Sequence, residues 1–176
     1  MTPRTTYGFE PSVPEVAIRL AEETDVPILE RWDNAEHVRA VSGDDELWDW
    51  PTEISVPWQE VWLCEVDKNP IGVVIVLDAA GDPSHYWDTE TERVSPHTYA
   101  IDIWIGEPDA IGRGYGTVMM KHAIARAFDV HGAHRILIDP LITNERAINF
   151  YRSLGFAEVG PRRFGNDDCL VLALNR

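Results

Sequence analysis

Three groups in the second half of the chain have residue types that could carry out transfer chemistry. The first is the segment Ile111–Thr117, Ile-Gly-Arg-Gly-Tyr-Gly-Thr, which places three glycines at alternate positions before an amphipathic stretch. Glycines let a backbone approach a ligand closely, and the free N–H groups at a helix start suit a pyrophosphate. Arg113 adds a cation there. The spacing fits neither a dinucleotide-binding fingerprint nor a P-loop, and a glycine-rich turn without a ligand is the alternative.

The other two groups are a pair of carboxylates and a phenol that could move protons. Asp102 lies near the end of the apolar segment His97–Ile105, and Asp139 precedes Pro140 at the end of another. A carboxylate can orient an ammonium group or accept its proton, and the phenol of Tyr151, with an ordinary pKa of about 10, can donate one. The alternatives are capping or solvent-facing roles for the two aspartates and a core position for Tyr151.

Hydrophobic periodicity predicts the elements that must position these groups. The alternation over His97–Ile105 indicates a strand, and apolar residues at helical spacing over Tyr115–Val130 indicate a helix that Gly132 ends. After it we expect a strand over His134–Asp139, a helix over Asn144–Leu154 stopped by Gly155, and strands over Phe156–Val159 and Cys169–Leu174 around a turn at Gly165–Asn166.

The first half of the chain predicts further strands. A hairpin is expected from Glu60–Val66 and Ile71–Asp78 around a turn at residues 67–70. The order of elements predicts an α/β (α+β) fold with a mixed sheet. The remaining expectations are a strand over Glu15–Ala21, a helix capped by Thr24 with Pro27 in its first turn and running to about Asn34, a short helix and loops over Glu36–Trp58, and a long surface excursion over Ala79–Pro96.

Charge is distributed unevenly along the 176 residues. The chain has 30 acidic and 15 basic side chains, a net charge of −15, which disfavours binding to nucleic acid or to an anionic membrane. Residues 1–110 hold 24 acidic and 6 basic side chains, whereas residues 111–176 hold 6 and 9. The first part would attract cations and the second would tolerate an anion. The alternative is an acidic surface that only keeps the protein soluble or reflects a salty habitat.

The sequence also predicts a soluble, cytoplasmic protein without a metal. Its apolar runs, such as Val73–Leu77, are far shorter than a membrane span, and its start lacks the pattern of a signal peptide. Cys64 and Cys169 lie in separate alternating segments, so we expect two buried thiols. His131 and His134 lack a third ligand.

Over Tyr99–Phe156, the motifs resemble the acyl-CoA half of the GNAT superfamily of N-acetyltransferases. The most specific signal is Asn144–Phe156, Asn-Glu-Arg-Ala-Ile-Asn-Phe-Tyr-Arg-Ser-Leu-Gly-Phe, which follows the Gly-Arg-Gly-Tyr-Gly-Thr segment. Within the superfamily, Ile101-Asp102 together with Ile138-Asp139-Pro140 is similar to the aminoglycoside 6'-N-acetyltransferases. The resemblance implies one domain over residues 1–176, with a mostly antiparallel sheet of about six to seven strands flanked by helices and one splayed parallel strand pair.

The resemblance also implies roles for individual residues, with acetyl-CoA as the acetyl donor. Asp102 would orient and deprotonate the acceptor amine, Tyr151 would protonate the departing thiolate, and Asp139 would bind a second ammonium group. Backbone N–H groups around Trp104 would hold the thioester oxygen. The superfamily usually has Arg or Gln where this chain has Ile111. The residues expected to contact acetyl-CoA are Ile103, Trp104, Ile105, Gly112, Arg113, Gly114, Tyr115, Gly116, Thr117, Asn144, Ala147 and Tyr151.

The acceptor would be bound mainly by residues 1–110, and acetyl-CoA by a core over 97–156. Trp48, Asp49 and Trp50, with the acids of Asp82–Glu92, could match the rings and ammonium groups of an aminoglycoside, although tryptophans there could equally be core. The leading hypothesis is acetylation of an aminoglycoside 6'-amine, which would give antibiotic resistance. The alternatives are acetylation of polyamines or protein N-termini, and a noncatalytic acyl-CoA-binding module. We expect a monomer or homodimer.

Overall fold

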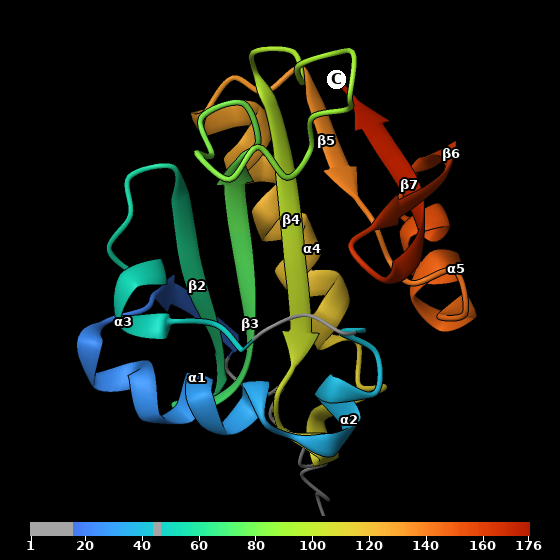
Figure 1. Ribbon diagram of the computed structural model, residues 1–176. Coiled ribbons are helices and arrows are strands. Elements are labelled where there is room, and N and C mark those ends of the chain that lie inside the picture. The colour runs from blue at the N-terminus through green and yellow to red at the C-terminus, as the bar shows by residue number, and fades with distance from the viewer. Residues whose placement is uncertain (1–15, 44–46) are drawn as a thin grey trace, which may run out of the picture.

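The fold is built on one seven-stranded sheet in a computed structural model that describes residues 16–43 and 47–176. The strand order is β1-β2-β3-β4-β5-β7-β6 (Figure 1). All neighbours are antiparallel except β4 and β5, so the predicted mixed, mostly antiparallel sheet is confirmed. The strands are β1 (Val16–Leu20), β2 (Gln59–Val66), β3 (Asn69–Asp78), β4 (Thr98–Ile105), β5 (Arg135–Ile138), β6 (Ala157–Phe164) and β7 (Asp167–Asn175).

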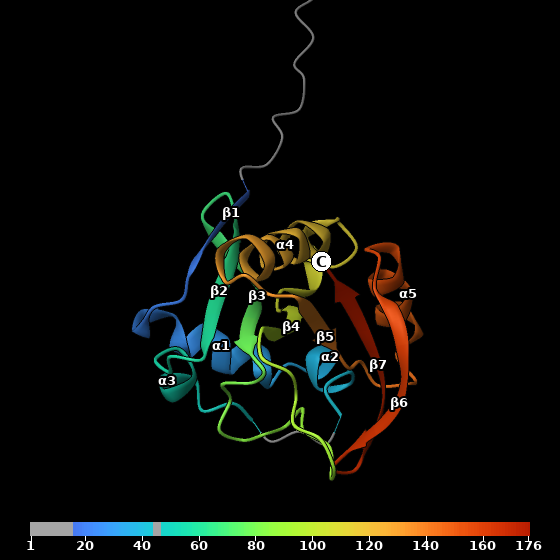
Figure 2. The same cartoon turned by 90° about the horizontal axis from the view of Figure 1, so that it is seen from above.

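Helices cover both faces of the sheet (Figure 2). The three short helices α1 (Val26–Asp33), α2 (Glu36–Arg39) and α3 (Trp50–Glu53) lie on one face, and α4 (Tyr115–Ala125) and α5 (Glu145–Ser153) lie on the other. Two single 3₁₀ turns, Glu23–Asp25 and Pro108–Ala110, precede α1 and the loop before α4, and a π-helical turn, Arg126–Val130, continues α4.

The side chains of β4 alternate between the two faces and so divide the core. Ile101, Ile103 and Ile105 pack in the cluster of α4, which includes the fully buried Met119. Trp104 packs in the other cluster, with residues of α1 and α3. Successive side chains of a strand point to opposite faces. Asp102 therefore lies on the α1–α3 face of the sheet, beside Trp104.

The structure refines the predicted elements of the first half. The hairpin turn needs only Asp67 and Lys68, whose φ angles are +49° and +65°, so β3 begins at Asn69, earlier than predicted.

Thr24 is not the helix cap. Asp25 occupies the N-cap position of α1 but makes no side-chain cap hydrogen bond. Its carboxylate instead closes the capping box of the preceding 3₁₀ turn by accepting the N–H of Glu22 at 2.8 Å, and it forms an ion pair with Arg19 at 2.7 Å. Residues 36–58 contain two short helices rather than one.

The last hairpin is longer than predicted. β6 runs on to Phe164 and β7 starts at Asp167, so the predicted turn at Gly165–Asn166 is correct but the strands are not confined to apolar residues. β6 is an edge strand with mostly exposed side chains, so its sequence lacks the apolar alternation that marks a half-buried strand. Cys64 and Cys169 are buried and form no disulfide, as predicted. Among the described residues, no helix is long and apolar enough to cross a membrane.

Candidate active site

The parallel strands β4 and β5 separate along their length and leave a gap between them. Their pairing covers only Thr98–Ala100 against Arg135–Leu137, while β4 continues to Ile105 (Figure 1). The N–H of Gly106 donates to the carbonyl of Ile71 in β3, and the carbonyl of Thr98 accepts the N–H of Ala79, the residue after β3. Because backbone groups alternate in direction along a strand, those of Ile101, Ile103 and Ile105 point into the gap. Backbone donors are thus available on both sides of Trp104, while its own N–H points toward β3.

The glycine segment forms the turn between β4 and α4. Gly112 and Gly114 have φ angles of +79° and +87°, and Gly114 is the residue that caps α4. A Cβ atom at either position would meet no atom within 4 Å, so both glycines face open space. Intrahelical bonds begin with the N–H of Thr117, which leaves the N–H groups of Tyr115 and Gly116 ahead of them. This arrangement can hold an anionic group at the helix start.

The start of α5 lies near this turn. A Cβ on Gly116 would lie 3.7 Å from the ring of Phe150, which brings α4 and α5 together beside the turn. Asn144 caps α5, because its side-chain oxygen accepts the N–H of Ala147 at 3.1 Å. Asn144 and Ala147 are both half-buried. The start of α5 therefore lies beside the glycine turn that opens α4.

Asp102 and Asp139 both lie close enough to Tyr151 for their charges to act on its phenol. Tyr151 is only 9% exposed, against Phe150 and Phe156. Burial raises the pKa of its phenol, and the negative charges of Asp102 and Asp139 raise it further. The phenol therefore stays protonated across the neutral range. In the parallel register, Asp102 and Asp139 each lie two residues beyond the last pair, Ala100 and Leu137, so the two carboxylates border the gap from facing strands.

A cluster of three tryptophans packs beside Asp102 on the α1–α3 face. Trp48 and Trp50 stack with centroids 5.3 Å apart, and each lies about 6 Å from Trp104. The buried carboxylate of Asp33 accepts the N–H of Trp48 at 2.8 Å and fixes its backbone. Trp50 is fully buried, so its predicted contact with an acceptor does not fit, because a ring without exposed surface cannot touch a ligand without moving. Asp49 is exposed, and Thr52 donates to it at 2.7 Å.

The acids of the excursion have two different roles. Asp82 accepts the N–H of Ser84, and Asp88 accepts the N–H of Val94, so these two carboxylates hold the loop itself. Glu53 of α3 has a raised pKa, mainly through burial, with further contributions from the charges of Asp49 and Asp82. Carboxylates of α3 and of the excursion thus add to the negative potential on the α1–α3 face.

The excursion also reaches the end of β5. The phenol of Tyr86 donates a 2.7 Å hydrogen bond to the Asp139 carboxylate. The guanidinium of Arg162 on β6 donates to the carbonyls of Tyr86, Trp87 and Asp88, and Trp87 is buried. The sequence analysis did not identify Tyr86. An aromatic dipeptide within an otherwise polar loop was the available signal, because such residues need a packing partner.

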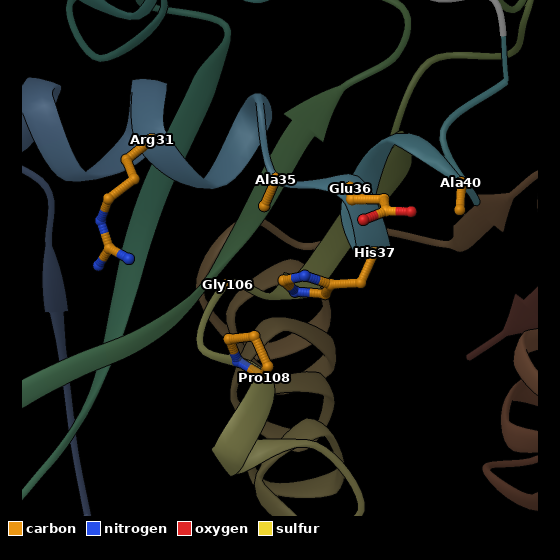
Figure 3. A pocket seen from close by; sticks show the side chains of 7 residues that line it. All are labelled: Arg31, Ala35, Glu36, His37, Ala40, Gly106 and Pro108. Atoms are coloured by element: carbon orange, nitrogen blue, oxygen red, sulfur yellow. The ribbon is translucent and has the colours of Figure 1, made fainter.

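A cavity of about 660 Å³ opens where α1 and α2 meet the turn after β4 (Figure 3). His37 points into it, and its Nε2 lies 3.0 Å from the carbonyl oxygen of Ile105 in the gap. Glu107 holds this turn to α1 by accepting hydrogen bonds from Arg31 and from Trp32. No sequence pattern marked His37, Glu107, Arg31 or Trp32, since nothing in their spacing links α1 and α2 to the end of β4. The cavity is lined by Arg31, Ala35, Glu36, His37, Ala40, Gly106 and Pro108.

Within residues 16–43 and 47–176, no group of three or more His, Cys, Asp or Glu side chains could hold a metal ion.

Comparison with known proteins adds independent evidence about this arrangement. Residues 21–164 match the family described as acetyltransferase (GNAT) domain. Aminoglycoside N(6')-acetyltransferase type 1 from Klebsiella pneumoniae is 27% identical over 156 residues, covering 82% of this chain and 75% of the relative. The protein of the same name from Serratia marcescens matches equally.

Solved structures share the fold. A crystal structure of the aminoglycoside acetyltransferase AAC(6')-Ib with coenzyme A has a TM-score of 0.78 at 24% identity, covering 92% of this chain and 95% of the other. Spermidine N-acetyltransferase from Vibrio cholerae, with CoA and spermine, has a TM-score of 0.72 at 18% identity, covering 91% and 95%. At these identities the similarity shows the fold alone.

Proposed function

This chain belongs to the acetyltransferase (GNAT) domain family, and on that premise we propose that it acetylates a primary amine of a polycationic small molecule, the 6'-amine of an aminoglycoside. One observation carries the proposal: Asp102 and Asp139 border the gap between β4 and β5 from facing strands, and the charges of both act on Tyr151. The two carboxylates can bind two ammonium groups of one acceptor. The protonated phenol can supply the proton that the leaving thiolate needs. The curated relatives named above are aminoglycoside N(6')-acetyltransferases, which supports this choice of acceptor.

The residues around the gap fit acetyl-CoA as the donor. The open space at Gly112 and Gly114, and the N–H groups at the start of α4, would receive the pyrophosphate. Asn144 and Ala147 would line the cofactor arm. The superfamily usually has a polar residue where this chain has Ile111. The apolar side chain removes one polar contact with acetyl-CoA but leaves the backbone N–H donors in place. When bound, acetyl-CoA supplies an activated acetyl group as a thioester.

Each chemical requirement of acyl transfer has a residue in this structure. Asp102 orients the acceptor ammonium and takes its proton at a carboxylate oxygen, directly or through water. The N–H groups of Ile103 and Ile105, which point into the gap, hold the carbonyl oxygen as it gains negative charge. The Tyr151 hydroxyl gives its proton to the departing sulfur. The C–N bond forms as the C–S bond breaks. The new amide nitrogen then loses its second proton, which passes through water and restores the proton that Tyr151 gave to sulfur, and the proton that Asp102 removed from the ammonium returns to solvent.

The acceptor side rests on charge and aromatic surface. Asp139 would hold a second ammonium group, and the half-buried ring of Trp48 would lie against a sugar ring, with the buried Trp50 supporting it. Asp49, with Glu53 and Asp82 near it, adds to the attraction for cations. A polyamine would interact with the same carboxylates. Because a spermidine N-acetyltransferase shares the fold, a polyamine is the second candidate acceptor.

The test is thiol release from acetyl-CoA with a panel of acceptors. The panel contains kanamycin-type aminoglycosides, spermidine, a short peptide, and an aminoglycoside with a 6'-hydroxyl group as the matched control. Turnover only with 6'-amino compounds is the expected result. Turnover with spermidine or the peptide alone would discard the aminoglycoside acceptor, and CoA binding without turnover on any amine would point to a noncatalytic acyl-CoA-binding module.

Two consequences of the proposal concern the cell. An enzyme that uses acetyl-CoA on aminoglycosides would act in the cytoplasm and would protect the cell from these antibiotics. Expression of the chain in a susceptible bacterium should therefore raise the inhibitory concentration of a kanamycin-type drug, and expression of an Asp102→Asn variant should not.

A further inference from the structure

We infer that Tyr86 is a positioning residue that fixes the Asp139 carboxylate and thereby sets the preference for acceptors with a second ammonium group. This inference rests on the proposed function. Tyr86 lies on the excursion between β3 and β4, far from Asp139 in sequence, and its phenol donates to Oδ2 of Asp139 at 2.7 Å. A phenol donates one hydrogen bond, while a carboxylate can accept about four. The contact therefore orients the carboxylate and leaves it capacity to bind a cation.

The excursion presents Tyr86 from a fixed backbone. Arg162 of β6 donates to the carbonyls of Tyr86, at 3.2 Å, and of Trp87, at 2.8 Å, and also to that of Asp88. Trp87 is 6% exposed and belongs to a core cluster with residues of β4, β5 and β7. Because Arg162 binds three successive carbonyls and the ring of Trp87 is buried, the backbone of the excursion is restrained at Tyr86.

The ring of Tyr86 is held as firmly as its backbone. It stacks on Phe164 with centroids 4.5 Å apart and planes 9° apart, and it meets the edge of Trp87 at 5.5 Å. Arg162 lies over the other ring of the stack, 4.3 Å from the Phe164 centroid. Yet Tyr86 is 42% exposed, so it borders solvent rather than filling the core. Phe164, Trp87 and Asp139 thus contact the ring or the hydroxyl of Tyr86. These contacts fix the direction in which its hydroxyl meets the carboxylate.

The carboxylate that Tyr86 holds lies across the gap from Asp102. The parallel register ends at the pair Ala100 and Leu137, so Asp102 and Asp139 each lie two residues beyond it on facing strands, and the charges of both act on Tyr151. In the proposed mechanism Asp102 binds the reacting amine. A fixed Asp139 would therefore favour acceptors whose second ammonium group lies at a set distance from that amine. Preorganised charge binds more tightly than charge that must first be ordered. Losing the phenol hydroxyl should therefore weaken binding of diamines more than binding of monoamines.

The test compares two acceptors that differ by one ammonium group, 6-amino-6-deoxyglucose and 2,6-diamino-2,6-dideoxyglucose. Tyr86→Phe removes the hydroxyl and keeps the stack on Phe164. It should raise the ratio of KM for the diamine to KM for the monoamine about tenfold, the usual value of one hydrogen bond to a charged group, with the change in KM rather than kcat. Tyr99→Phe, which removes a phenol hydroxyl on the α4 face, is the matched control and should leave the ratio unchanged.

A double-mutant cycle with Asp139→Asn decides whether Tyr86 acts through Asp139. If it does, the double variant should show the same KM ratio as Asp139→Asn alone. Additive effects, or a loss from Tyr86→Phe that is equal for both acceptors, would overturn the inference. A wild-type protein that acetylates neither sugar nor any acceptor of the earlier panel would instead overturn the proposed function.

Discussion

Tyr151 has an environment unlike that of a free tyrosine side chain, because it is buried near two carboxylates. Burial of the residue and the negative charges of Asp102 and Asp139 all raise the pKa of its phenol, so every influence acts in the same direction. A buried phenol next to negative charge resists ionisation, because the phenolate would be neither solvated nor paired. In the proposed reaction this keeps the proton on Tyr151 until a strongly basic thiolate needs it.

The raised pKa leads to a prediction about pH. An unperturbed tyrosine ionises near pH 10, and a raised pKa moves that loss to higher pH, so kcat should show no decline from Tyr151 between pH 7 and about pH 10. Tyr151→Phe should lower kcat about tenfold to a hundredfold at every pH in this range. Steady-state rates across the range would check both. A decline below pH 10 that Tyr151→Phe removes would contradict the assignment.

A second prediction concerns Asp102. Asp102→Asn keeps the shape of the side chain and removes its charge and basicity, so kcat should fall by roughly a hundredfold or more while the Kd for acetyl-CoA stays nearly constant. Asp129→Asn is the matched control, because Asp129 is exposed and lies beyond α4. Near-full kcat in Asp102→Asn would refute its role as the base.

At the scale of elements, the turn before α4 depends on glycine for its backbone angles rather than for space. Gly114→Val should weaken acetyl-CoA binding about tenfold or more, because a β-branched residue at a φ of +87° must distort the turn. Gly132→Val is the matched control: its φ is +68° and it also has open space, but it follows the π-helical turn after α4. Calorimetric titration of CoA into both variants checks this. Equal affinities would show that the turn does not bind the cofactor.

The contact between α1 and the end of β4 predicts a change in stability. A Cβ atom on Gly106 would lie 2.1 Å from the ring of the fully buried Trp32, so Gly106→Ala should lower the free energy of unfolding by about 1–3 kcal/mol. Gly116→Ala, where the new Cβ would make an ordinary 3.7 Å contact inside a helix, should not destabilise the protein. Urea denaturation of both variants measures the difference. An equally stable Gly106→Ala would mean that Trp32 moves freely.

At the scale of the whole molecule, the net charge of −15 and its concentration in the first 110 residues create a field that favours cations. The Debye length shortens from about 10 Å at 0.1 M salt to about 3 Å at 1 M, so long-range attraction should fade over this range. KM for a kanamycin-type acceptor should rise several-fold with KCl, and KM for 6-amino-6-deoxyglucose much less. A parallel rise for both acceptors would assign the effect to something other than acceptor charge.

The sequence alone was sufficient for much of the sheet and for the glycine turn. Alternation over β2, β3 and β4 predicted these strands, and helical spacing over α4 and α5 predicted helices, because burial of one face imposes a local period. The positive φ angles at Gly112 and Gly114 follow from a residue type that can adopt them. By contrast, the ends of β6 and the cap of α1 were predicted incorrectly. An exposed edge strand has no apolar period, and the 3₁₀ turn Glu23–Asp25 precedes α1 and places Asp25 rather than Thr24 at the N-cap position.

What only the tertiary structure decided is which distant residues meet. Asp102, Asp139 and Tyr151 come from two strands and a helix, and their proximity depends on where β4 and β5 stop pairing. Trp50, one of the predicted acceptor contacts, is buried beneath Trp48, and Tyr86, which no motif marked, reaches Asp139. Local sequence fixes the direction of a side chain relative to its own element, but the separation of two elements is set by packing over the whole chain.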